Sequence, residues 1–259
     1  MRYAALAACL VLALPPLAAA QTPAPKPAGP EFLPRAQFHL AANALAPGDE
    51  QSRWDAYYGG EVDLVDYVVG RASIVADYHP VLGDELRPFD PNQAYYVLEA
   101  SSSYRAGDLE IAGVFHHVSR HLSDRPKPFA IAWNVLGVRV MRRVTRNGVT
   151  IDWRGDVGSV VQHSFADYSW NMEGDVVVRR AISPRVGVFV HATTELFTVD
   201  GSIPDRGTQA GGRLEGGVRF SGRAGALELF AGVERRLDAD PLDRQSERWA
   251  LAGFRLLSR

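Results

Sequence analysis

Three polar side chains near the middle of the chain have the types required for nucleophilic chemistry. His117 and Ser119 are separated by one residue, and Asn134 follows after a polar stretch. A serine hydroxyl is a poor nucleophile unless a base lies within hydrogen-bond reach, and the base works best when a third group fixes its tautomer. Ser119 as nucleophile, His117 as base and Asn134 as the orienting group would together be suited to acyl transfer.

The strand pattern around His117 and Ser119 decides which surface they occupy. Leu109, Ile111 and Phe115 alternate with charged or polar residues, and His117 and Ser119 continue the same apolar side. Side chains on a strand repeat every two residues. We therefore expect both polar groups on an otherwise apolar face.

Asn134 is expected on that face as well, because it shares the parity of Leu136 and Val138 on the following strand. A loop symmetric about residues 125–126 places His117 directly opposite Asn134, with Cβ atoms roughly 5 Å apart. The three groups should then form one cluster.

Period-two alternation recurs along the chain from Arg35 onward and predicts about twelve strands. The segments are 35–44, 53–65, 71–82, 94–105, 109–119, 131–144, 149–158, 170–180, 185–197, 212–221, 226–237 and 247–257.

The connections between these segments alternate in length. Short joints are expected at 66–70, 106–107, 146–148, 183–184 and 222–225, and longer polar loops at 46–52, 83–92, 121–128, 162–169, 199–209 and 238–246. Outer-membrane barrels have short turns in the periplasm and longer loops outside.

The distribution of charge favours a membrane barrel over a soluble sandwich. Nearly every strand carries ionised groups on one face and apolar residues on the other, with aromatic residues near strand ends. Lipid requires every backbone group to be paired, which a closed barrel achieves. The predicted fold is all-β, a closed antiparallel transmembrane β-barrel of about twelve strands, whose many interior charges should narrow or plug the lumen.

The start of the chain predicts export. Residues 1–20 have the charged, apolar and small-residue order of a signal peptide, residues 21–34 form a proline-rich periplasmic segment, and residues 35–259 form the barrel. Cys9, the only cysteine, is expected to leave with the signal. The expected location is the bacterial outer membrane, with its lipids as partners, and the near-balanced charge gives no indication of nucleic acid binding.

The motifs His117-Val118-Ser119, Ser123-Asp124 and Trp133-Asn134 together resemble the outer-membrane phospholipase A family. The similarity covers about residues 83–149. It implies a lipid acyl hydrolase in which Ser119, His117 and Asn134 carry the reaction on the lipid-facing wall. It also implies Ca²⁺, bound partly by Asp124 with Ser123 nearby, and a homodimer formed through the barrel walls.

The chain departs from the family pattern directly after the serine. The family has Asn-Gly there, and the glycine N–H helps to hold the oxyanion, whereas this chain has Arg120-His121. Arg120 and a bound cation are the candidates to replace that donor. For calcium, Asp84, Glu85 and Asp167 are further candidate ligands from neighbouring loops. A lipid A deacylase barrel also has a His-x-Ser motif but no Trp-Asn pair.

Two other interpretations of the histidines remain open. His116, His117 and His121 can form a hydrated cluster at headgroup level, or a three-histidine metal site, although His116 is expected to point inward and His117 outward. The alternative function is a non-enzymatic outer-membrane barrel, either a narrow pore or a structural or adhesive protein.

Overall fold

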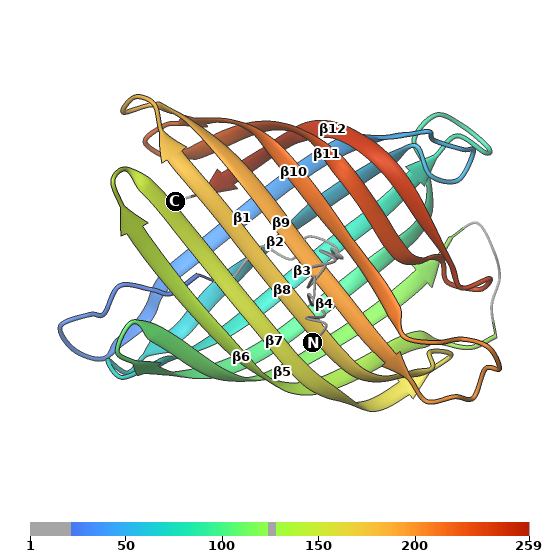
Figure 1. Cartoon of the computed structure of the whole chain (residues 1–259), viewed down its shortest axis with the longest axis horizontal. Coiled ribbons are helices and arrows are strands. Elements are labelled where there is room, and N and C mark those ends of the chain that lie inside the picture. Colours follow the sequence, from blue (N-terminus) through green and yellow to red (C-terminus); the bar gives the residue numbers. More distant parts are fainter. Residues whose placement is uncertain (1–21, 124–127, 259) are drawn as a thin grey trace, which may run out of the picture.

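The computed structural model describes residues 22–123 and 128–258, and in these residues the chain forms twelve strands (Figure 1). The predicted signal peptide lies outside the described residues. The strands are β1 (Glu31–Ala46), β2 (Trp54–Asp66), β3 (Arg71–Gly83), β4 (Asp90–Ala106), β5 (Leu109–Leu122), β6 (Ile131–Arg146), β7 (Val149–Ser164), β8 (Tyr168–Ala181), β9 (Val186–Val199), β10 (Gln209–Ser221), β11 (Gly225–Asp240) and β12 (Gln245–Ser258).

Each strand pairs antiparallel with its neighbours in sequence, and β1 pairs with β12 to close the barrel. Figure 1 shows the strands strongly tilted, as closure of a barrel requires. The predicted fold class is therefore confirmed. Among the described residues, no helix is long and apolar enough to cross a membrane.

The strands have 13 to 17 residues, more than the 9 to 11 or so that cross a bilayer. This length shortens three predicted connections. The loops expected at 83–92, 162–169 and 238–246 contain only residues 84–89, 165–167 and 241–244, because the strands on either side continue further. The short joints occur where they were expected, and the 147–148 turn has positive φ at both Asn147 and Gly148, as a two-residue hairpin requires.

The first strand begins at Glu31, four residues before the expected start at Arg35. Its pairing with β2 is interrupted between Phe32 and Arg35, where Leu33 adopts a positive φ and Pro34 follows. Proline has no N–H to give to the ladder, so an irregularity at this point is expected. The end of the proline-rich segment thus contributes to the barrel.

The outer face is apolar and the inner face carries the charges. Exposed side chains such as Leu136, Val138 and Leu98 alternate with buried polar ones such as Glu99 and Arg139. Several of the aromatic residues expected on the lipid side are exposed, among them Trp54, Tyr96, Tyr104 and Trp170.

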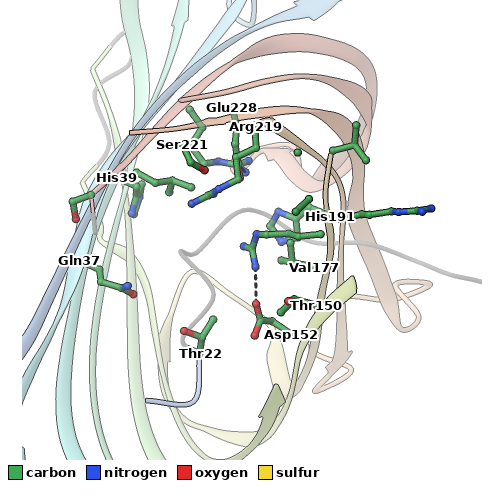
Figure 2. A pocket seen from close by; sticks show the side chains of 18 of the residues that line it. Thr22, Gln37, His39, Thr150, Asp152, Val177, His191, Arg219, Ser221 and Glu228 are labelled. Atoms are coloured by element: carbon green, nitrogen blue, oxygen red, sulfur yellow. Dashed lines mark hydrogen bonds and ion pairs between the residues drawn. The ribbon is translucent and has the colours of Figure 1, made fainter. Parts of the chain in front are cut away.

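The lumen is filled by ion pairs and rings across much of its length. Arg236 Nη2 lies 2.6 Å from Asp55 Oδ2, and Arg213 Nη1 lies 3.3 Å from Glu234 Oε2. A cluster of buried aromatic and aliphatic side chains that includes Trp133 fills another part of the lumen. These contacts confirm the expectation of a narrowed lumen. The largest cavity described lies at the end with the short turns, has a volume of about 570 Å³, and includes Thr22 of the N-terminal segment in its wall (Figure 2).

Candidate functional site

The lipid-facing side of β5 and β6 carries the three predicted site residues. His117 is paired directly with Asn134, as the symmetric loop predicted. Ser119, two residues further along β5, is paired with Ala132 on β6 and with Tyr96 on β4. All three polar side chains are partly exposed on the outer face, where the burial pattern of β5 alternates. The predicted position of the cluster is therefore confirmed.

A chain of hydrogen bonds fixes the orientation of His117. Its Nδ1 lies 2.6 Å from Asn134 Oδ1, and Asn134 Nδ2 donates to Gln162 Oε1 at 2.9 Å. Because an amide oxygen only accepts, Nδ1 must carry the proton when the ring is neutral. The other ring nitrogen, Nε2, is then the unprotonated one and can act as a base.

Ser119 has a different hydrogen-bond partner from the one expected. Its Oγ lies 3.1 Å from His121 Nε2, and no hydrogen bond joins it to His117 within residues 22–123 and 128–258. His117 and His121 precede and follow Ser119 by two residues, so all three share one face of β5. The serine hydroxyl thus lies between two imidazole rings and is held by the second.

A row of tyrosines leads across the neighbouring strands to Ser119. Tyr58, Tyr78 and Tyr96 are consecutive cross-strand partners on β2, β3 and β4, with ring centroids 5.2 and 4.8 Å apart. The next residue of the row is Ser119, and the ring of Tyr96 meets His121 edge-on at 4.9 Å. Tyrosine is enriched where membrane meets water. The site therefore adjoins an aromatic band on the outer wall.

Arg120 does not occupy the place of the missing oxyanion donor. Its side chain is buried in the lumen, where Nη2 donates to Gln93 Oε1 at 3.2 Å and to the carbonyl oxygen of Ala239 at 3.3 Å. The parity of β5 explains this result, because residues next to Ser119 must point to the opposite face. The prediction that Arg120 replaces the missing oxyanion donor is therefore wrong.

His116 also points inward, as expected, and its Nδ1 lies 3.2 Å from Glu99 Oε2 in the lumen. The wall of the barrel separates it from His117 and His121. This arrangement excludes a shared three-histidine metal site.

Most of the candidate calcium ligands among the described residues have partners within the protein. Ser123 donates its hydroxyl to the carbonyl oxygen of Pro91, Asp84 pairs with Arg53 at 2.7 Å, and Asp167 pairs with Arg206 at 2.9 Å. No group of three or more His, Cys, Asp or Glu side chains in the described ranges is arranged to hold a metal ion. Asp124 lies outside the described residues, so the predicted pair of Asp124 and Ser123 stays a prediction.

Gln162 and His121 are the two contacts that the sequence pattern did not assign. Gln162 was placed in a loop, but β7 continues to Ser164, and the ladder with β6 shifts register between Asn134 and Val135. The extra residue, Val161, changes the parity of β7 and turns Gln162 outward. The position of His121 could have been predicted from the sequence, because it lies two residues after Ser119 and so shares its face of β5.

Comparisons with known proteins support the fold. No family model matches the chain, and no curated protein matches its sequence. Among solved structures, outer membrane phospholipase A from Escherichia coli matches with a TM-score of 0.52 at 10% identity, covering 86% of this chain and 92% of that one. LpxR from Salmonella typhimurium matches with a TM-score of 0.48 at 9% identity, covering 86% and 99%. At these identities the likeness concerns the barrel fold alone. The closed barrel with an apolar outer face and charges inside is itself the architecture of an outer-membrane protein.

Proposed function

We propose that this barrel is a lipid acyl hydrolase of the phospholipase A type, with its site on the lipid-facing wall. The observation that carries the proposal is the pair of His117 and Asn134, joined at 2.6 Å on a surface that otherwise faces hydrocarbon. An ionisable side chain in such a place costs free energy, so its presence there points to a function. The substrate that meets this wall is a lipid ester.

In the proposed reaction, Ser119 Oγ attacks the ester carbonyl carbon while His117 Nε2 takes the hydroxyl proton. The carbonyl oxygen becomes an oxyanion, and the tetrahedral intermediate then breaks its bond to the glycerol oxygen, which leaves with the proton held by His117. Water next attacks the acyl-enzyme with His117 again as base, and the fatty acid departs. Ser119 must rotate from His121 toward His117 before the first step.

His121 is the group we propose in place of the glycine N–H of the family. Its Nε2 already lies 3.1 Å from Ser119 Oγ, so a proton on Nε2 is close to where the oxyanion develops. The edge contact with Tyr96 supports the ring from the neighbouring strand. A preorganised donor at this position is worth a few kcal/mol of transition-state stabilisation.

We also propose that calcium binds beside the site and that the barrel forms a homodimer. Asp124 and Ser123 would contribute oxygen ligands, which Ca²⁺ prefers, and bound calcium would add positive charge near the ester carbonyl. Asp124→Asn should raise the calcium concentration needed for activity, and crosslinking in detergent with calcium or with chelator should reveal the proposed dimer.

The direct test is release of fatty acid from phospholipid in mixed micelles by the purified full chain, with calcium or with chelator. Ser119→Ala and His117→Ala should abolish release, whereas Ser159→Ala, a serine on the same outer wall paired with Leu136, should not. Release that survives either site substitution contradicts the assignment. Absence of release by the wild-type protein in every detergent would favour the non-enzymatic barrel.

A further inference from the structure

The cavity at the short-turn end of the lumen has the size and position of a small-molecule pocket. Its volume of about 570 Å³ is within the range of ligand sites. Figure 2 shows Thr150 and Asp152 on one part of its wall and Arg219, Ser221 and Glu228 on another. Short turns of outer-membrane barrels face the periplasm, so this cavity, the vestibule, belongs to the periplasmic end.

The arginines of the vestibule cover its carboxylates. The side chains of Arg143, Arg179 and Arg219 are 42%, 29% and 26% exposed, whereas those of Asp152 and Glu228 are only 3% and 2% exposed. A solute that enters the vestibule therefore meets guanidinium groups first. The carboxylates lie behind them against the barrel wall.

The ion pairs of the vestibule also leave an excess of positive charge at Asp152. Both Arg143 Nε and Arg179 Nη1 lie 2.6 Å from this single carboxylate. The Nε of Arg179 is buried and has no hydrogen-bond partner. One carboxylate thus neutralises only one of the two guanidinium charges.

The charges around Glu228, which binds Arg219 and Arg255, are closer to balanced. Glu228 binds Arg219 at 2.6 Å and Arg255 at 2.9 Å, but Arg255 has a further partner in Glu215. Arg219 uses one N–H, on Nη1, in its bond to Glu228. Its other N–H groups are available to a ligand because the side chain is partly exposed.

The lumen beyond the vestibule is closed by the buried pairs of Arg236 with Asp55 and Arg213 with Glu234. Both pairs lie among fully buried side chains. A solute can therefore enter from the periplasmic end but meets buried ion pairs and only a small further cavity of about 90 Å³. This arrangement is better suited to binding a solute in the vestibule than to letting it pass through the barrel.

We propose that the vestibule binds a small oxyanion, bearing a phosphate or carboxylate group, from the periplasm. Arg143, Arg179 and Arg219 would form charge-assisted hydrogen bonds with it, since planar guanidinium groups match the geometry of such anions. The hydroxyl groups of Thr150 and Ser221 line the same space and add neutral donors. This site is separate from the lipid-facing wall and does not depend on hydrolase activity.

The test is calorimetric titration of the full chain, purified in a neutral detergent, with pyrophosphate and, in a second series, with succinate. Saturable binding of either anion that weakens with added salt is expected. The Arg143→Gln/Arg179→Gln double variant should weaken it about a hundredfold or more, because two charge-assisted hydrogen bonds are lost. Arg223→Gln, in the turn at the same end but outside the vestibule wall, should leave the affinity unchanged.

Asp152→Asn should change the affinity for the anion in the opposite direction. It removes the internal anion that competes for Arg143 and Arg179, so pyrophosphate should bind about tenfold more tightly, the equivalent of one charge-assisted hydrogen bond. Only protein with the heat-modifiable gel mobility of a folded barrel enters the titrations. Wild-type protein that binds neither anion at 10 mM or so, an unchanged double variant, or weaker binding by Asp152→Asn would each overturn the proposal.

Discussion

His117 and Asn134 face one another across the β5–β6 ladder on the lipid side, with Nδ1 and Oδ1 2.6 Å apart. His117 lies on β5 and Asn134 on β6, so the pair forms only when the two strands are correctly aligned. The register of β5 against β6 creates the contact. A change of register by one residue would move one partner to the lumen.

Asn134→Ala should lower the turnover number about 100-fold, because His117 would lose the acceptor that selects its tautomer. The KM should change much less, since Asn134 is assigned no contact with substrate. Asn134→Asp, which keeps an acceptor oxygen, should restore part of the turnover. Steady-state kinetics of fatty-acid release measure both constants, and a loss confined to KM would contradict the orienting role.

Gln162→Ala should have a smaller effect of the same kind. Gln162 accepts a hydrogen bond from Asn134 Nδ2 at 2.9 Å and so keeps Asn134 Oδ1 turned toward His117. Without it the amide can flip, and we expect a loss in turnover of about tenfold, equivalent to one hydrogen bond. Gln162→Glu retains an acceptor and should restore activity, an outcome that a merely structural role would not require.

His121 variants separate two roles for its ring. If His121 donates to the oxyanion, His121→Ala should reduce turnover about 100-fold or more, whereas His121→Gln, which keeps an N–H donor but no base, should retain a substantial part. If His121 were the base, the glutamine variant would be as inactive as the alanine variant. Fatty-acid release by the two variants, compared at equal amounts of folded protein, decides between these roles.

Arg120→Ala should affect stability and not catalysis. Its guanidinium group is the partner of Gln93 and of the Ala239 carbonyl in the lumen, and leaving such buried groups unpaired costs about 1–3 kcal/mol. Unfolding in urea, followed by tryptophan fluorescence, should show that loss. A large fall in turnover of the folded variant would reopen the possibility that Arg120 acts at the oxyanion.

The buried pair of Asp55 and Arg236 should be far more sensitive to substitution than a pair at the periplasmic end. Asp55→Ala removes the carboxylate that binds both Nη atoms of the buried Arg236, whose Nε keeps its 2.7 Å bond to Glu234. The variant should lower the free energy of unfolding by about 3–5 kcal/mol. The matched control is Asp108→Ala, whose 3.0 Å bridge to Arg142 is exposed and should contribute less than about 1 kcal/mol. Equal losses in the two variants would show that burial does not control these ion pairs.

Much of the barrel could be predicted because the alternation of side chains and the lengths of the connections are local signals. The strand count, the outward positions of His117 and Ser119 and the pairing with Asn134 all follow from parity and from one hairpin. The position of Gln162 could not be predicted, because the bulge at Val161 changes the parity of β7 without a mark in the sequence. Parity also could not predict whether Ser119 hydrogen-bonds to His117 or to His121, since both rings lie on the same face.

The row of Tyr58, Tyr78 and Tyr96 that ends at Ser119 bears on the kinetics of the proposed hydrolysis. A site beside an aromatic band is supplied by molecules that diffuse within the plane of the bilayer. Its effective substrate concentration is a mole fraction of the surface, not a molarity in solution. Dilution of phospholipid with inert detergent at constant bulk concentration should therefore slow the reaction, while addition of more mixed micelles of the same composition should leave the rate per saturated barrel unchanged.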